Sequence, residues 1–359
     1  MAPSWKSSAL FGLLASGLST ASPVTARNAT GTCTKNQRKE WRTLTDEEKS
    51  AYLTAEKCLM TSPAKSGIEG AVTRWDELQW AHIVQSNDIH GVGQFLPWHR
   101  AYVSLHEKLL QTECNYTGAQ PYWDWTKDSS NNGSLAASPV FGSDELSFGS
   151  NGQGATGGID GSACVTDGAF ANTTLRLAQV WGVNNYTEYC LSRAFETTRY
   201  YFDWANSTYV DTCYAEEDYV DGAFDCYRQK PHSSIHLAVG GTLADQSSSP
   251  GDPIFFLHHT NLDRLWWQWQ AASLPARLEE MGGNNIPANS SLTTGKWLYP
   301  SDDVLNYDGD PANVTTMNHN LWMVGLTPNT TVSEVMDIRG EYVCAEYVDD
   351  DLSASDKAW

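Results

Sequence analysis

Apolar side chains recur at helical spacing in three stretches of the first third of the chain. The first stretch follows Thr45, which precedes three acidic residues and so has the sequence of a helix N-cap with an acidic first turn. Residues 70–85 and 98–110 repeat the spacing, with Tyr102, Leu105 and Leu109 on one side of the second of these. The pattern predicts three helices there, preceded by an extended segment over residues 22–45.

Helical spacing returns in the second half. It predicts helices over residues 184–202, 229–238 and 252–272, and Asp252 and Pro253 suit the N-cap and the first helical position of the last one. We therefore expect a mainly α fold.

Two stretches lack an apolar period. Residues 129–168 are rich in Gly, Ser, Asn and Asp, which predicts a long loop. Residues 300–359 read as a tail of loops and short strands. With no internal repeat or long linker, residues 22–359 are expected to form a single catalytic domain.

The start of the chain has the features of a secretory signal. Lys6 precedes an apolar run too short to span a bilayer, and small residues follow it, so we expect residues 1–21 to be a signal peptide cleaved after Ala21. The eight cysteines are even in number and form no C-x-x-C pair, which favours disulfides. Nine N-glycosylation sequons also predict a secreted glycoprotein, at Asn28, Asn115, Asn132, Asn172, Asn185, Asn206, Asn289, Asn313 and Asn329.

The charge balance narrows the range of partners. Lys+Arg 23 against Asp+Glu 43 gives a formal net charge of -20, which repels both phosphate backbones and anionic lipid surfaces. We expect neither a nucleic-acid nor a membrane partner.

Eight of the nine histidines lie in two clusters. The first cluster contains His82, His90, His99 and His106, and the second contains His232, His236, His258 and His259. Metals held by neutral imidazoles need about three such rings converging from different elements.

The settings of the first cluster differ from one another. His82 ends a predicted helix, His90 lies in a loop with Gly91 and Gly93, and His99 opens the next helix. Three backbone settings can aim three rings at one point. For His106, further along that helix, we expect a buried hydrogen-bonding role.

The second cluster leaves one choice open. His232 and His236 are spaced to share one helix face. His258 and His259 are adjacent, about 100° apart around a helix axis, so either of them could be the third ligand and the other a supporting group. Two sets of three imidazoles without cysteine or carboxylate favour copper over zinc or iron.

Two long motifs resemble the copper signatures of tyrosinases and catechol oxidases. They read HGVGQFLPWHRAYVSLHE and GDPIFFLHHTNLDRLW. The resemblance implies a central four-helix bundle with long loops and few short strands, holding two copper ions as a type 3 centre. The implied ligands are His82, His90 and His99 for one copper and His232, His236 and His259 for the other.

The resemblance also implies roles for neighbouring residues. Phe255 would pack over a copper-binding ring, His258 would support the ligands, and Asp263 with Arg264 would form a buried polar pair that orients helices. Arg100 and Glu107 would act similarly.

The implied activity is oxidation of o-diphenols to o-quinones by O2. Asp88 stands where some members carry a cysteine cross-linked to a histidine, so no cross-link is expected. Ser233 follows His232 where members that hydroxylate monophenols often have Asn, which predicts weak or no monophenol hydroxylation and leaves o-aminophenols as further substrates. Ser233, Leu237 and Phe255 would line the substrate pocket, with Leu237 at its entrance. The alternatives are a hemocyanin-like O2 carrier, a dinuclear metal hydrolase, and a copper-binding protein without turnover.

Overall fold

The computed structural model describes residues 36–130, 133–180, 183–185, 187–286, 310 and 313–348. These residues are mainly helical and their strands are two to four residues long, as predicted. The predicted signal peptide lies outside the described residues, as do residues 22–35 of the predicted extended segment.

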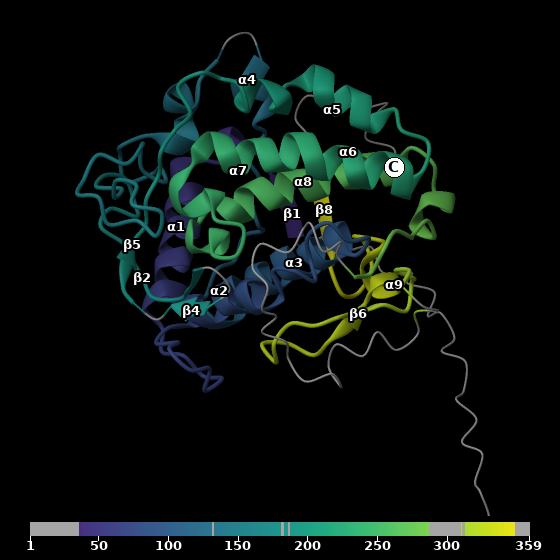
Figure 1. The fold of residues 1–359 in the computed structure, drawn as a ribbon, viewed down its shortest axis with the longest axis horizontal. Helices are drawn as coiled ribbons and strands as arrows, with labels where there is room; N and C mark the ends of the chain where they lie inside the picture. Colours follow the sequence, from purple (N-terminus) through teal and green to yellow (C-terminus); the bar gives the residue numbers. More distant parts are fainter. Residues whose placement is uncertain are drawn as a thin grey trace, which may run out of the picture. The chain divides into compact units, whose positions relative to one another are not determined.

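Four helices carry four of the six candidate metal ligands, and His90 and His232 lie just outside them. The four helices are α2 (Arg74–Gln85), α3 (Phe95–Glu113), α7 (Ser233–Val239) and α8 (Ile254–Ala271). In Figure 1, α7 and α8 run alongside each other, and α3 packs against α8. The predicted helices over 70–85, 98–110, 229–238 and 252–272 are therefore confirmed, with shifted ends.

Side-chain caps fix where two of the early helices begin. Thr45 caps α1 (Asp46–Thr61) and Thr73 caps α2, each in a capping box with an acidic residue three positions later. Each box satisfies two backbone N–H groups that a helix start would leave without a partner. The capping at Thr73 explains why α2 starts later than the apolar spacing suggested.

Helix α3 is central because almost its whole length is buried. Trp98, Tyr102 and Leu105 are all at most 2% exposed and belong to the main hydrophobic core. The core continues into α8, where Phe255, Phe256 and Trp266 are fully buried. A helix that is apolar on most sides is held by tertiary packing rather than by its own propensity.

The strands form four small pairs. Strand β1 (Asn36–Lys39) pairs in parallel with β8 (Ala345–Val348), so the two ends of the described chain meet beside α3 and α8. The antiparallel pairs are β2 (Thr174–Leu175) with β5 (Tyr189–Cys190), β3 (Ala178–Val180) with β4 (Val183–Asn185), and β6 (Asn320–Leu321) with β7 (Thr330–Thr331).

The predicted helix over residues 184–202 is wrong. Its described residues form β4, β5 and irregular chain up to a 3-10 segment at Phe202–Ala205. Cys190 in β5 is bonded to Cys164, and Leu191 N donates to Thr173 O, so cross-strand contacts outcompete the helical spacing.

The remaining elements are short. Apart from Ser129, which ends α4, residues 129–168 are irregular in their described part except for 3-10 segments at Leu135–Ala137 and Pro139–Phe141, as predicted. A π-helical stretch at Tyr219–Phe224 and another at Arg228–His232 lead into α7. The other α-helices are α4 (Thr126–Ser129), α5 (Ser207–Tyr214), α6 (Asp225–Tyr227) and α9 (Val332–Val335). None of the described helices combines the length and apolar character that crossing a bilayer requires.

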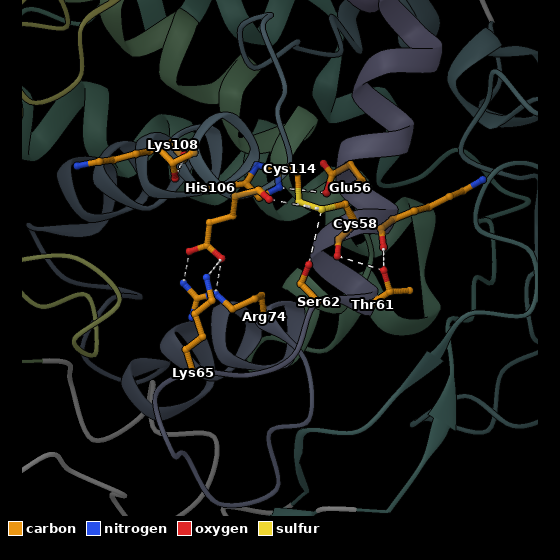
Figure 2. Close-up of a disulfide and its surroundings, with 12 residues drawn as sticks. Glu56, Cys58, Thr61, Ser62, Lys65, Arg74, His106, Lys108 and Cys114 are labelled. Carbon is orange, nitrogen blue, oxygen red and sulfur yellow. Dashed lines mark hydrogen bonds and ion pairs between the residues drawn. A yellow bond between two sulfur atoms is a disulfide. The ribbon is translucent and has the colours of Figure 1, made fainter.

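Disulfides confirm the reading of the cysteines. Figure 2 shows the Cys58–Cys114 bond, which ties the last turns of α1 to the end of α3. Cys164–Cys190 and Cys213–Cys226 are also bonded, Cys344 is disulfide-bonded, and no described cysteine is free.

Replacing both Cys58 and Cys114 by Ala is expected to lower the free energy of unfolding by about 2–4 kcal/mol, because the bond closes a long loop in the unfolded chain. The matched control is the pair Cys213 and Cys226, whose sequence separation is 13 rather than 56, so its loss should cost less. Urea denaturation followed by tryptophan fluorescence measures both. Equal losses for the two pairs would contradict the loop-length argument.

A carboxylate beside this bond makes the junction acid-sensitive. Burial alone would raise the pKa of Glu113, but hydrogen bonds from Arg74 and Lys65 hold it below its usual value of 4.5. Stability from Glu113 is therefore fully present above this usual value, which the unfolded chain has, and is lost as the pH falls through the lower folded-state pKa. In urea denaturation between pH 6 and pH 3, we expect Glu113→Gln to lose stability less steeply than the parent; parallel curves would disprove this.

Candidate metal centre

Three histidines from α2, the α2–α3 loop and α3 converge with the same orientation. The Nδ1 atoms of His82, His90 and His99 lie 2.9, 2.7 and 2.8 Å from the carbonyl oxygens of Ser247, Ser86 and Phe95. A carbonyl only accepts, so each Nδ1 carries the proton. Each neutral ring therefore presents an unprotonated Nε2, the form that binds a metal.

A second set of three rings comes from the helical run through α7 and from α8. His236 Nε2 lies 3.1 Å from His232 Nε2 and 3.3 Å from His259 Nε2. Three nitrogens at about 2.0–2.1 Å from one ion in tetrahedral directions are about 3.3 Å apart. The spacing therefore suits a single ion held by these three rings.

This geometry distinguishes the two adjacent histidines on α8, His258 and His259. His259 brings its Nε2 to the other two rings, whereas His258 is fully buried with no hydrogen-bond partner for either ring nitrogen. The His258 ring lies nearly parallel to that of His232, at 5.5 Å between centroids. All four rings are still close enough to form one group of possible ligands.

The two sets face each other. The rings of His99 and His259 stack with centroids 4.5 Å apart and planes 13° apart, and those of His90 and His232 lie 6.4 Å apart. Two ions held by these sets would share one space between them.

Burial keeps all six rings neutral. It lowers the pKa of His90 and of His236 to about 4. Burial, followed by the charges of neighbouring histidines, places the pKa values of His82, His99 and His259 well below the usual value, and that of His232 likewise. Neutral imidazoles are free to donate their lone pairs to a metal.

The donor set fits copper. The Nε2 atoms of His82 and His99 are buried without a hydrogen-bond partner, which costs about 1–3 kcal/mol per polar atom unless a metal binds. Among the described residues, both groups contain histidine alone, with no cysteine or carboxylate. All-imidazole sites suit copper, and hard oxygen-seeking ions are disfavoured.

Comparison with known proteins agrees with this donor set. The family profile described as the common central domain of tyrosinase matches residues 72–272. The chain belongs to the tyrosinase family. It is 32% identical to a tyrosinase-like protein of Diaporthe leptostromiformis over 86% of this chain and 77% of that protein.

Two further relatives cover even more of the chain. A tyrosinase of Aspergillus flavus is 31% identical over 91% of this chain and 86% of that protein. The solved structure of a mutant polyphenol oxidase from Thermothelomyces thermophila is 30% identical, covers 89% of this chain and 91% of that chain, and has a TM-score of 0.70. The protein is thus a copper oxidoreductase with a type 3 dicopper centre.

Buried charges brace the tyrosinase-type helices behind the rings. Asp263, one turn after His259, accepts hydrogen bonds from Arg100, Arg38 and Tyr347. Arg38 also pairs with Glu107 at 2.7 Å. The sequence paired Asp263 with Arg264, but Arg264 instead bonds Asn261 and lies over the Tyr122 ring.

The three expected pocket residues differ in exposure. Leu237 is 42% exposed, as an entrance residue requires, and Ser233 is half-buried with its hydroxyl donated to Arg228 O. Phe255 is fully buried and stacks on the His259 ring at 4.0 Å. Phe255 therefore packs over the ring of a candidate ligand, as predicted, but its full burial corrects the further expectation that it lines an open pocket.

His106 has the hydrogen-bonding role expected of it. Its two ring nitrogens face Gln120 Oε1 at 2.8 Å and Glu56 Oε2 at 3.1 Å, and its ring stacks on Phe256. With both nitrogens engaged, His106 has none left for a metal.

The segment between α7 and α8 helps to orient two of the candidate ligands, a role that the sequence did not reveal. Its carbonyls at Leu243 and Ser247 orient His236 and His82. The segment is anchored by Asp252, which makes a fully buried double hydrogen bond with Arg193. Gly240 at the start of this segment is a hint in the sequence, because a Cβ there would lie 2.3 Å from Ala194 O. The need for glycine can be recognised only once the fold has brought Ala194 close.

Two buried histidines on α3 provide a matched test. His99→Ala is expected to reduce copper below two ions per chain, because an Nε2 donor is lost. His106→Gln should keep both ions and lose about 1–3 kcal/mol of stability, because buried partners lose hydrogen bonds. Elemental analysis and urea denaturation measure these. Full copper loading of His99→Ala would refute its ligand role.

Proposed function

We propose that this protein oxidises o-diphenols to o-quinones with O2, and hydroxylates monophenols weakly or not at all. The observation that carries the proposal is the pair of facing imidazole sets. We assign His82, His90 and His99 to one copper and His232, His236 and His259 to the other.

The two copper ions supply O2 binding and electron transfer when bound. Each O2 takes four electrons and four protons from two diphenols, which gives two quinones and two waters. The residues of the chain hold six neutral imidazoles at fixed spacing. Their metal-binding nitrogens stay unprotonated near neutral pH.

The surroundings of the second set support a diphenol preference. The exposed Leu237 offers apolar surface to an aromatic ring beside His236. The Ser233 hydroxyl, next to His232, is already donated to Arg228 O. We infer that Ser233 does not help a water to deprotonate a monophenol, and that o-aminophenols, which like diphenols carry two ring donors, are also oxidised.

We also propose that the protein is secreted and N-glycosylated. Disulfides are typical of secretory proteins, and the sequon residues Asn115, Asn172, Asn313 and Asn329 are exposed. Release of glycan mass by an N-glycosidase from protein produced by a secreting host tests this.

Turnover of 4-methylcatechol by copper-loaded and copper-free protein tests the main proposal. We expect quinone formation and O2 uptake only in the loaded sample, and a much slower or undetectable reaction with p-cresol. Reversible O2 binding without quinone would indicate a carrier instead, and p-cresol turnover as fast as that of 4-methylcatechol would contradict the diphenol preference. Hydrolysis of ester or phosphate substrates without O2 uptake would indicate a hydrolase.

A further inference from the structure

The loop between α2 and α3 carries the one ligand of the six that lies outside a helical segment. His90 follows the end of α2 at Gln85 and precedes α3 at Phe95. Within its own loop, His90 Nδ1 lies 2.7 Å from Ser86 O, and Asp88 N and Ile89 N both donate to Gln85 O. This single turn does not continue as a helix through residues 90–94, so contacts from other segments also help to set the position of the loop.

The side-chain amide of Gln94 supplies that restraint. Gln94 is 1% exposed, and its Nε2 donates to Asp88 O at 2.7 Å and to Asn285 O at 3.0 Å. Its Oε1 accepts from the Thr315 hydroxyl at 2.8 Å. One amide therefore joins the start of the His90 loop to two segments that follow α8 in the sequence.

The neighbouring Gly93 restrains the loop from both sides. Gly93 N donates to Asn284 O at 2.8 Å, and the Tyr219 hydroxyl donates to Gly93 O at 2.7 Å. A Cβ at position 93 would lie 1.9 Å from Gly282 O, so this close approach requires glycine. The contacts at Gly93 and Gln94 fix the loop against residues 282–285 and 313–316.

We propose that Gln94 is a positioning residue for the first copper ion. Its amide holds the His90 loop so that His90 Nε2 stays aligned with those of His82 and His99. The inference rests on the copper ligands proposed above. Loss of a group that orients a metal ligand typically weakens metal binding about 10–100-fold.

The first test compares Gln94→Met with Gln111→Met. Gln111 is a matched control because it lies in α3, the helix that Gln94 directly precedes, and its amide also bonds other segments, at Asn36 Oδ1 (3.0 Å) and Gly118 O (2.9 Å). Chelator competition on the copper-loaded proteins should show one of the two ions bound about 10–100-fold more weakly in Gln94→Met and neither weakened in Gln111→Met.

Single-site backgrounds show which ion is affected. In a protein that carries both His258→Ala and His259→Ala, where the first set alone is complete, adding Gln94→Met should weaken the remaining copper. In a His82→Ala protein, where the second set alone is complete, adding it should change nothing. Equal weakening in both backgrounds would overturn the assignment to the first copper.

The Thr315 hydroxyl gives a milder perturbation that decides the question if Gln94→Met does not fold. Thr315→Val removes the donor to Gln94 and should weaken one copper, whereas Thr315→Ser keeps it and should bind both normally. Asn313→Gln controls for the sequon that Thr315→Val also removes. Normal copper binding by Thr315→Val would then overturn the proposal.

A purely structural role has a different signature. Gln94→Met would then lower the melting temperature of the copper-free protein and leave copper affinity at the parental value, and this result rejects a positioning role. Failure of the proposed function is separate, because the parent would then bind two coppers without oxidising 4-methylcatechol.

Discussion

The centre depends on hydrogen bonds from imidazole Nδ1 to backbone carbonyls. A carbonyl cannot donate, so each bond fixes the tautomer and leaves Nε2 as the only free lone pair. His82, His90, His99 and His236 all have such bonds at 2.6–2.9 Å. Burial reinforces them by lowering the pKa values, so the unprotonated Nε2 atoms persist at neutral pH.

Some of the carbonyls that orient these rings lie close to the histidine in the sequence, and others lie far from it. His90 and His99 bond the carbonyl four residues earlier, within the α2–α3 loop for His90 and within α3 for His99. His82 and His236 depend on the segment between α7 and α8, which is held in turn by the buried Arg193–Asp252 pair. The long irregular region before that segment thus serves the centre through Arg193, which also donates to the Gly149 carbonyl.

A second buried network orients the helices themselves. Asp263 accepts hydrogen bonds from Arg38 in β1, Arg100 in α3 and Tyr347 in β8. A buried carboxylate is tolerated only when its lone pairs are satisfied, so these elements must arrive together. The distant ends of the described chain thereby help to set the angle between α3 and α8, the helices of His99 and His259.

The sequence by itself determined the helices with strong apolar spacing, the presence of disulfides and the two histidine clusters of the candidate centre, because motif spacing and helical period are local properties. The sequence predicted a helix over 184–202, where the structure has cross-strand contacts and a disulfide instead. It also placed Phe255 in the substrate pocket, whereas this side chain is fully buried. Spacing alone could not choose between His258 and His259; the motif resemblance favoured His259, and the fold brings its Nε2 to 3.3 Å from that of His236. Only the tertiary structure decided the partners of Asp263 and the hydrogen bonds of the Gln94 amide. Each of these groups joins segments that are far apart in the sequence, and nothing in the sequence indicates that they are in contact.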